Sequence, residues 1–575
     1  MRVTHSCTRD EIREAYIAPL RSAMIVDDSF PRYEQLVDLV GASANSGLYE
    51  YDAAKRVINM CHDRSLVCDV ENRASAKLTP EQLHRITKAD LVILDYHLTP
   101  GDQTDVRPAL SILQTLADSD HANLVVIYTK HTLITALRDV FIRFRGIDKK
   151  AELPAEYDAT DLTEWMPSFD AEKLFAYLHD RSVLGDLIAA ARAELEAFGV
   201  KKQDVAAVTK AGVELWLKAK FAHVEAPQRV EGLVVARSTE AEPTPWVHFK
   251  NVFVAFVSKT DADADVFDSL EAALTSWNPG ILRLILCNAR NRMVQRGFDY
   301  EKIVVGSPER QIGLLYHALG AEEPNAGLQE MLRRLFDSAR RQLAADSGQF
   351  GTRLVRRHMD AATAPPEGDN ERTHFYIQHA RAMAHVESAG TDAEIIGALN
   401  AFLCSRPFDG SHLFAGTVFR DEQKSTWWLC AAPSCEIVPR EPKADKTWRS
   451  DIHPSLPMQA LRLEEATSLE AALGKATEAK HIFVQFDGRT VPLRVLEQGS
   501  GQPRPEMLIL HDAGRIDRQQ TFKAYAVVKG PELQARTFRV VAQLRNEYAD
   551  RFLHQTGHHV SRVGVDFVPF RTGGS

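Results

Sequence analysis

The chain has 575 residues, of which 45% are hydrophobic and 26% are charged, and its formal net charge is −9. This composition is ordinary for a globular protein of several domains, and it excludes a global nucleic-acid-binding surface, which would require clustered Lys and Arg. Seven cysteines without a CxxC pair exclude a disulfide framework, and no apolar run approaches the roughly 20 residues that span a bilayer, so we expect a cytoplasmic protein without membrane contact.

The first predicted strand ends in two acidic residues. An amphipathic helix is expected over Thr8–Leu20, and the apolar run Ser22–Val26 then leads directly into Asp27 and Asp28. The two carboxylates are suited to bind a cation at the end of a strand. They are also suited to cap a helix that begins near Pro31, and the two interpretations are compatible.

Helices and one strand fill the interval before the next acidic strand end. Helices are expected at Tyr33–Val40 and Ala53–Cys61, and a strand at Ser65–Val70. A further helix begins after Thr79, because Thr79 suits the N-cap, Pro80 the first helical position, and Gln82 the third position of a capping box.

The stretch KADLVILDYHLTPGD, which begins at Lys88, contains the strongest local signal. Leu91–Leu94 lacks the alternation of a half-buried strand, so it predicts a central strand of a parallel α/β sheet. Asp95 follows this strand at the end where such sheets place ligands, although a turn cap is the alternative for this residue alone. With Asp27 and Asp28 it would place three carboxylates at one sheet edge, which is a magnesium site in outline.

The alternation of strand and helix continues after this stretch. Pro108–Ala117 has the apolar spacing of a helix, and Asn123–Tyr128 is another apolar strand, followed by Thr129 and Lys130. This order predicts an α/β fold with a doubly wound parallel sheet.

At this point the residues resemble the receiver domain of response regulators. The match consists of the acidic pair Asp27 and Asp28 after the first strand, Asp95 at the phosphoacceptor position, and Thr129 as the hydroxyl residue that ends the fourth strand. The pattern from Asp95 to Asp102 also looks like the receiver loop after the phosphoacceptor. The resemblance implies a receiver, or flavodoxin-like, sheet. A receiver also needs a lysine at the end of its fifth strand, and none follows at the usual distance.

A long insertion explains the missing strand. Its clearest helical segments are Ala171–Leu178, Val183–Phe198 and Val205–Lys220. The apolar strand Asn251–Ser258 then ends in Lys259, which is the preferred match, while Lys130 is the local competitor. Phe256 occupies the position of the aromatic switch residue of receivers.

The resemblance implies a phosphoacceptor chemistry. Asp95 would take a phosphoryl group from the phosphohistidine of a sensor histidine kinase. A Mg²⁺ cofactor would be held by Asp27, Asp28, Asp95 and the backbone carbonyl of His97.

The resemblance also implies a switch. Lys259 would pair with one phosphoryl oxygen, and Thr129 would bond another. The movement of Thr129 would open a space for Phe256, which converts a local change of charge into a change of surface.

Beyond the receiver, residues 280–400 are expected to be helical. Helices are predicted at Ile281–Gln295, after Ser307, and at Leu328–Leu343, which carries several arginines. No helix-turn-helix spacing or aromatic platform accompanies these arginines, so we favour a solvated helix face and expect no nucleic-acid partner. Ala361–Asn370 has the composition of a linker.

Residues 401–575 change to short strands, as in a small barrel or an open β domain. The predicted strands are Leu413–Val418, Thr426–Ala431, Ile482–Phe486, Val491–Val495, Met507–Leu510 and Phe522–Val528, and a closing helix is predicted at Val540–His554.

Two cysteines in this part admit a metal interpretation. Cys430 and Cys435 would need His453 or the pair His558 and His559 to complete a zinc site. A buried structural cysteine is the favoured interpretation, and a nucleophilic role for Cys435 is a third hypothesis.

The C-terminal half has its own resemblance. The segments Gly416–Phe419, Trp428–Ile437, Gln543–Ala549 and Ser561–Gly564 look like the tail of long receiver-bearing proteins from bacterial defence gene clusters, with Glu436 where Asp is usual. This resemblance implies a phosphorelay that answers phage infection, with a separate effector protein.

We therefore expect a signalling protein that accepts a phosphoryl group, rather than an enzyme. The alternative is a receiver-like scaffold that binds partners without phosphorylation, because the insertion could cover the site. The predicted domains are a receiver in two parts (1–131 and 246–279), a mainly helical insertion (132–245), a helical region (280–400) and a β-rich C-terminal domain (401–575).

Overall fold

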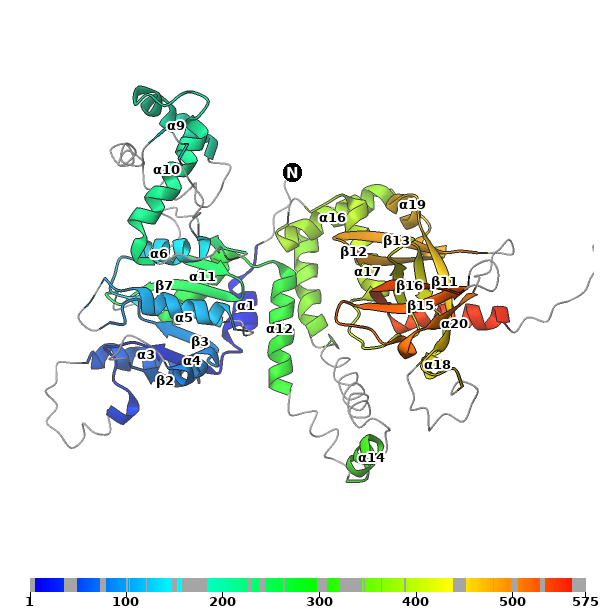
Figure 1. The fold of residues 1–575 in the computed structure, drawn as a ribbon. Coiled ribbons are helices and arrows are strands. Elements are labelled where there is room, and N and C mark those ends of the chain that lie inside the picture. The colour runs from blue at the N-terminus through cyan, green and yellow to red at the C-terminus, as the bar shows by residue number, and fades with distance from the viewer. Residues whose placement is uncertain are drawn as a thin grey trace, which may run out of the picture. The chain divides into compact units, whose positions relative to one another are not determined.

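The computed structural model divides the chain into two compact units, residues 1–365 with 382–385, and residues 366–381 with 386–575 (Figure 1). The structure describes residues 6–35, 49–72, 79–99, 102, 104–119, 121, 123–146, 153–154, 156–157, 184–224, 230, 232–236, 244–261, 264–296, 308–319, 344–345, 347–362, 364–386, 389–437, 451–478, 480–497, 505–527 and 533–560. Among these residues, no helix combines the length and the apolar character that crossing a membrane requires.

A seven-stranded sheet forms the centre of the first unit. Its strands are β1 (Ser22–Val26), β2 (Val67–Glu71), β3 (Leu91–Leu94), β4 (Asn123–Thr129), β5 (Val234–Val235), β6 (Trp246–Phe249) and β7 (Val252–Ser258). The strand order is β2-β1-β3-β4-β7-β6-β5, and the first five are parallel. This confirms the predicted receiver-like α/β fold class, with β7 as the strand that follows the insertion.

Two strands of the sheet differ from the prediction. β6 and β5 extend it in the antiparallel direction beyond β7. β5 lies within residues 132–245, which the sequence predicts to be mainly helical, whereas β6 begins at Trp246, the first residue of the second part of the predicted receiver. β5 has only two residues, which is too short for an apolar periodicity to be recognised.

Helices cover both faces of the sheet (Figure 1). They are α1 (Arg9–Ile12), which continues as a π-helix (Arg13–Ile17), α3 (Tyr51–Asp63), α4 (Pro80–Thr87), α5 (Arg107–Ala117), α6 (Leu133–Arg145), α11 (Val266–Trp277) and α12 (Ile281–Arg296). Val125 and Ile127 of β4 belong to the core beneath α5 and α6, whereas Val126 and Tyr128 belong to the core beneath α3 and α11. Because both faces are covered, every residue of β4 is buried, which explains its unbroken apolar sequence.

The described part of the insertion contains two of the three predicted helices. They are α9 (Leu184–Ala197) and α10 (Val205–Lys220), and α10 leads into a 3-10 turn, Ala222–Val224. The third prediction, Ala171–Leu178, lies outside the described residues, as does the basic segment Leu328–Leu343.

The predicted capping box of α4 is present. The Thr79 hydroxyl accepts the Gln82 N–H at 3.3 Å, and the Gln82 side chain accepts the Thr79 N–H at 2.8 Å.

We expect Thr79→Ala to destabilise α4 by about 1 kcal/mol, because one N–H of the first turn loses its acceptor. Hydrogen exchange of the α4 amides measures this. Thr87→Ala in the last turn of the same helix is the matched control, and an equal loss in both variants would contradict the capping argument.

The second unit contains a closed antiparallel β-barrel, in which β10, β9, β16, β15, β14 and β11 pair in turn and β10 pairs again with β11. The strands of this unit are β8 (Ser405–Arg406), β9 (Thr417–Asp421), β10 (Trp427–Cys430), β11 (Leu456–Glu465), β12 (His481–Phe486), β13 (Arg489–Val495), β14 (Pro505–Leu510), β15 (Thr521–Val527) and β16 (Leu533–Leu544). The rings of Phe419, Phe522 and Phe538 meet inside the barrel, with centroids 5.1–5.4 Å apart. The predicted β-rich C-terminal domain is confirmed.

The prediction for this unit was wrong in three places. The predicted strand Leu413–Val418 shares only Thr417 and Val418 with β9. β11 and β16 were not predicted, and the closing helix, α20 (Asn546–Val560), begins six residues after the predicted start at Val540. Phe538, Val540, Ala542 and Leu544 are buried at every second position, which is the period of a strand. The charged residues of β16 obscured this alternation.

Further described helices lie before the barrel strands in the sequence or between them. They include α14 (Pro308–Leu319), α16 (Asp369–Ala384), α17 (Asp392–Cys404), α18 (Ser434–Ile437) and α19 (Leu469–Leu473). α16 begins inside the predicted linker Ala361–Asn370, because Asp369 and Glu371 supply the acidic residues that favour a first helical turn.

Candidate functional site

The carboxyl ends of the central strands meet at one edge of the parallel sheet. There the N–H of Asp95 donates to the carbonyl of Val26 at 2.8 Å, and the N–H of Lys259 donates to the carbonyl of Thr129 at 2.8 Å. The ladder therefore continues one residue beyond each strand. It holds the backbone of the predicted site residues in fixed register.

Lys259 is the centre of this edge. Its Nζ lies 2.7 Å from Oδ2 of Asp27 and 2.5 Å from Oδ2 of Asp95, although 232 and 164 positions of sequence separate the partners. The lysine is only 7% exposed, and its ammonium group also lies over the rings of Phe30 and Tyr128 at 5.3 and 5.9 Å. A buried ammonium group requires such partners to compensate for its lost hydration. These contacts therefore hold the Lys259 side chain in place.

The competing lysine has a different environment. Lys130 is exposed, and its ammonium group pairs with the carboxylate of Glu50. The lysine that contacts Asp95 is therefore the one that follows β7, after the insertion, and not the one that follows β4.

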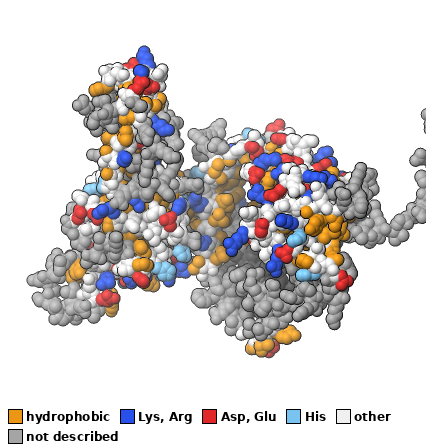
Figure 2. Space-filling model, in the orientation of Figure 1, with side chains coloured by type: hydrophobic (Ala, Val, Ile, Leu, Met, Phe, Trp, Pro, Cys, Tyr) orange, Lys and Arg blue, Asp and Glu red, His pale blue; other side chains and the backbone are white. Residues whose placement is uncertain are grey.

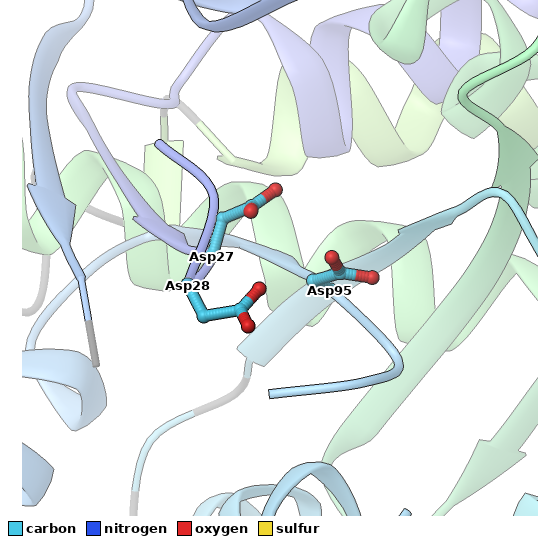
Figure 3. Close-up of side chains that lie close together, drawn as sticks. All are labelled: Asp27, Asp28 and Asp95. Carbon is cyan, nitrogen blue, oxygen red and sulfur yellow. The ribbon is translucent and has the colours of Figure 1, made fainter. Parts of the chain in front are cut away.

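Three carboxylates lie close together at this edge, and two of them, those of Asp27 and Asp95, contact the Lys259 ammonium group. Asp27, Asp28 and Asp95 each offer one oxygen, and these oxygens lie within 4.8 Å of one another (Figure 3). Oδ1 of Asp27, the oxygen that does not contact Lys259, accepts the N–H and the hydroxyl of Ser29, at 2.9 and 2.6 Å.

The electrostatics of the cluster are unbalanced, because three carboxylates face one lysine. Burial, and then repulsion by Asp27, raises the pKa of Asp95 to about 7 although Lys259 opposes the shift. The pKa of Asp28 is raised for the same two reasons. Burial alone would lower the pKa of Lys259, but the attraction of Asp27 and Asp95 outweighs it and raises the pKa. The cluster as a whole therefore favours a further cation.

The donor set fits magnesium. Hard carboxylate oxygens in a group of three are ligands that Mg²⁺ prefers, and the unbalanced negative charge favours its binding. Asp27, Asp28 and Asp95 would hold the ion. His97 follows Asp95 in the loop, and its N–H faces Oδ1 of Asp95 at 3.5 Å. Coordination by its carbonyl stays a prediction.

The two predicted switch residues are both buried. Thr129 is 1% exposed at the end of β4, and its hydroxyl oxygen accepts the N–H of His131 at 3.1 Å. Phe256 is also 1% exposed and belongs to the core beneath α5 and α6. In this structure the aromatic ring is therefore already inside the protein.

The sequence analysis predicted a role for the backbone carbonyl of His97 but missed the contact between its ring and the ring of His131. His97 and His131 lie two positions after Asp95 and Thr129, and their rings are 5.2 Å apart. Burial, and then the neighbouring His131, lowers the pKa of His97. Each histidine lies two positions after a predicted site residue at the end of one of two neighbouring strands, and this spacing could have indicated their proximity.

A zinc site in the second unit gains no support from the described residues. Cys430 is buried, and burial raises the pKa of its thiol to about 12. Among the side chains that the structure describes, only the three aspartates of the first unit form a group of potential metal ligands. The side chains of Cys435, His558 and His559 lie outside the described set.

Comparison with known proteins agrees with the geometry of the first unit. Residues 19–170 match the response receiver domain family. Neither a curated protein nor a solved structure matches the chain. The matched range contains Asp27, Asp28, Asp95 and Thr129 but ends before Lys259, which the fold brings to the same edge.

Proposed function

Because the first unit contains a divergent response receiver domain, which supports a response-regulator-like signalling role, we propose that the protein accepts a phosphoryl group on Asp95 from a histidine kinase. One observation carries the proposal: the Lys259 ammonium group bridges Asp27 and Asp95 from a strand distant in sequence. A lysine that served only as a surface charge would be exposed to solvent, whereas Lys259 is only 7% exposed.

The chemistry follows from the positions of these groups. An oxygen of Asp95 attacks the phosphorus of the donor, a P–O bond forms, and the P–N bond to the donor imidazole breaks, with its electron pair left on the ring nitrogen. Because the imidazole of the phosphohistidine carries a proton on its other nitrogen, the donor leaves as a neutral histidine. Lys259 moves from the carboxylate to a phosphoryl oxygen, and the Thr129 hydroxyl donates to another. When bound, Mg²⁺ supplies positive charge that stabilises the phosphoryl oxygens.

The proposed partners are a sensor histidine kinase and a separate effector. On the face in view, Figure 2 shows basic and acidic side chains interspersed over the described surface, which does not favour a phosphate-backbone partner. The resemblance of the C-terminal segments to receiver-bearing defence proteins leads us to propose that the phosphorelay answers phage infection. Phage challenge of cells that carry Asp95→Asn tests this setting.

A small phosphodonor tests the phosphorylation itself. With acetyl phosphate and Mg²⁺, the intact mass of the full-length protein should rise by one phosphoryl group, and Asp95→Asn should abolish the gain because the amide is a poor nucleophile. Asp102→Asn, in the same loop but exposed, is the matched control and should be labelled like the wild type. Equal labelling of Asp95→Asn would refute the assignment. An unlabelled wild type would favour the phosphorylation-independent scaffold.

A further inference from the structure

A buried polar network joins the loop after Asp95 to the insertion. The Tyr96 hydroxyl donates to Oδ2 of Asp139 at 2.5 Å, and Nε2 of His223 lies 3.2 Å from the same oxygen. Tyr96 is the residue after the proposed acceptor, Asp139 belongs to α6, and His223 belongs to the 3-10 turn of the insertion. Three separate segments therefore meet at one carboxylate.

The Asp139 carboxylate lies in an apolar environment. Asp139 is 4% exposed and Tyr96 is 1% exposed, and Tyr96 belongs to the core that also contains Val140 and Val224. Burial of a carboxylate is costly unless hydrogen bonds compensate for lost hydration. Burial, and then the charge of Asp139, raises the pKa of Tyr96. The phenol therefore stays protonated and acts as the donor.

The segment 216–224 of the insertion packs against α6 and into the core of the first unit at this point. Val224 is fully buried, and its carbonyl accepts a hydrogen bond from Arg143 of α6 at 3.1 Å. The ring of Phe221 lies 6.1 Å from the rings of both Trp216 and His223. The His223 side chain is 45% exposed, so it is the member of the network that solvent or a partner can reach.

On the other side, the network reaches both reactive strand ends. The Tyr96 ring contacts the rings of His97 and His131, with centroids 4.9 and 6.2 Å away. The backbone N–H of His97 faces Asp95, and that of His131 donates to Thr129. A displacement of Tyr96 would therefore move groups that contact the acceptor and the hydroxyl residue.

We propose that Tyr96, Asp139 and His223 are positioning residues through which the insertion controls phosphoryl transfer at Asp95. While His223 binds Asp139, the carboxylate holds Tyr96 and with it the loop that follows the acceptor. Since coupling between two sites is reciprocal, phosphorylation of Asp95 loosens or tightens the docking of the segment 216–224. This second effect rests on the proposed phosphorylation, whereas the coupling between loop and insertion does not.

Hydrogen exchange of the unphosphorylated full-length protein tests the coupling by itself. Tyr96→Phe removes one hydroxyl and keeps the ring, and it should raise deuterium uptake at least threefold in peptides that cover 216–224. His223→Ala should do the same for peptides that cover 95–99, and His223→Asn, which keeps an N–H donor, should restore part of the protection. Unchanged uptake in both directions would overturn the proposal even if Asp95 is phosphorylated.

The kinetic consequence is measured with acetyl phosphate and Mg²⁺. His223→Ala should change the rate of labelling or of phosphoryl loss at least threefold, whereas Lys218→Ala, an exposed change on the neighbouring helix α10, should change neither rate. Rates of His223→Ala within twofold of this control would overturn the control of phosphoryl transfer. A wild type that is never labelled refutes the proposed function, and the exchange result then decides the network alone.

Discussion

Lys259→Ala is expected to slow phosphoryl transfer to Asp95 at least about 100-fold. The ammonium group lies 2.5 Å from the carboxylate of Asp95, the proposed nucleophile, in a site that excludes most water. Removal of one preorganised donor at a developing negative charge typically costs a factor of about 100 to 1,000. The rate of labelling by acetyl phosphate, followed by intact mass, measures the effect.

The chain offers a matched control for this variant. Lys130 also follows an apolar strand at the same sheet edge, but its ammonium group pairs with Glu50. Lys130→Ala should therefore retain a labelling rate within about threefold of the wild type, because an exposed ion pair contributes little. If the two alanine variants were equally impaired, the assignment of Lys259 to the phosphoryl site would fail.

The residues of the site differ in how far the sequence predicts them. Asp27, Asp28, Asp95 and Thr129 each follow an apolar run, so a local pattern was enough to select them. Lys259 required the assumption that a strand beyond the insertion completes the sheet. The pairing of β4 with β7, in which Thr129 lies opposite Ser258, supplies that placement.

Nothing in the sequence indicated that Asp139 and His223 lie near the site. Asp139 occurs within a helix, where an acidic residue ordinarily faces solvent, and His223 occurs in a turn of the insertion. Only the packing of α6 against the sheet and the turn shows that the two meet Tyr96. Contacts of this kind depend on tertiary structure, which neither periodicity nor motif spacing encodes.

The elements of the fold also differ in how clearly a local sequence pattern predicts them. Strands covered on both faces, such as β3 and β4, have continuous apolar sequences and were predicted correctly. β16 alternates buried Phe538 and Val540 with Arg539, and its last residues were mistaken for the start of α20. The error arose at the junction of two elements, where the period changes from two residues to 3.6.

The site also has a cost in stability that depends on pH. Asp95 has an ordinary pKa of 3.8 in the unfolded chain and a pKa of about 7 in the folded protein. Between these values the folded state keeps a proton that the unfolded state has released. The free energy of unfolding therefore falls as pH rises from about 4 to 7, and the cost persists above pH 7.

Asp95→Asn should remove this cost. Without Mg²⁺ at about pH 8, we expect the variant to be more stable than the wild type by about 2 kcal/mol. This is about half of what a shift of roughly three pKa units would give at about 1.4 kcal/mol per unit, because the amide oxygen still accepts from Lys259 but no longer offers it a negative charge. The advantage should shrink as pH is lowered toward 4, where the wild-type carboxyl is protonated. Hydrogen exchange of peptides from β1 and β3 in the full-length protein measures the difference.

With Mg²⁺ bound, Asp95 should stabilise the folded protein, whereas without the ion it destabilises it. Saturating Mg²⁺ should stabilise β1 and β3 of the wild type by about 2 kcal/mol or more, since an ion that binds only the folded state shifts the equilibrium by mass action. Asp95→Asn removes one ligand and should gain much less, whereas Asp102→Asn should respond like the wild type. A wild type and an Asp95→Asn variant with the same dependence on pH and on Mg²⁺ would contradict both the raised pKa of Asp95 and its role as a ligand. With the expected result, a site that destabilises the empty protein at neutral pH becomes stabilising when a cation neutralises it.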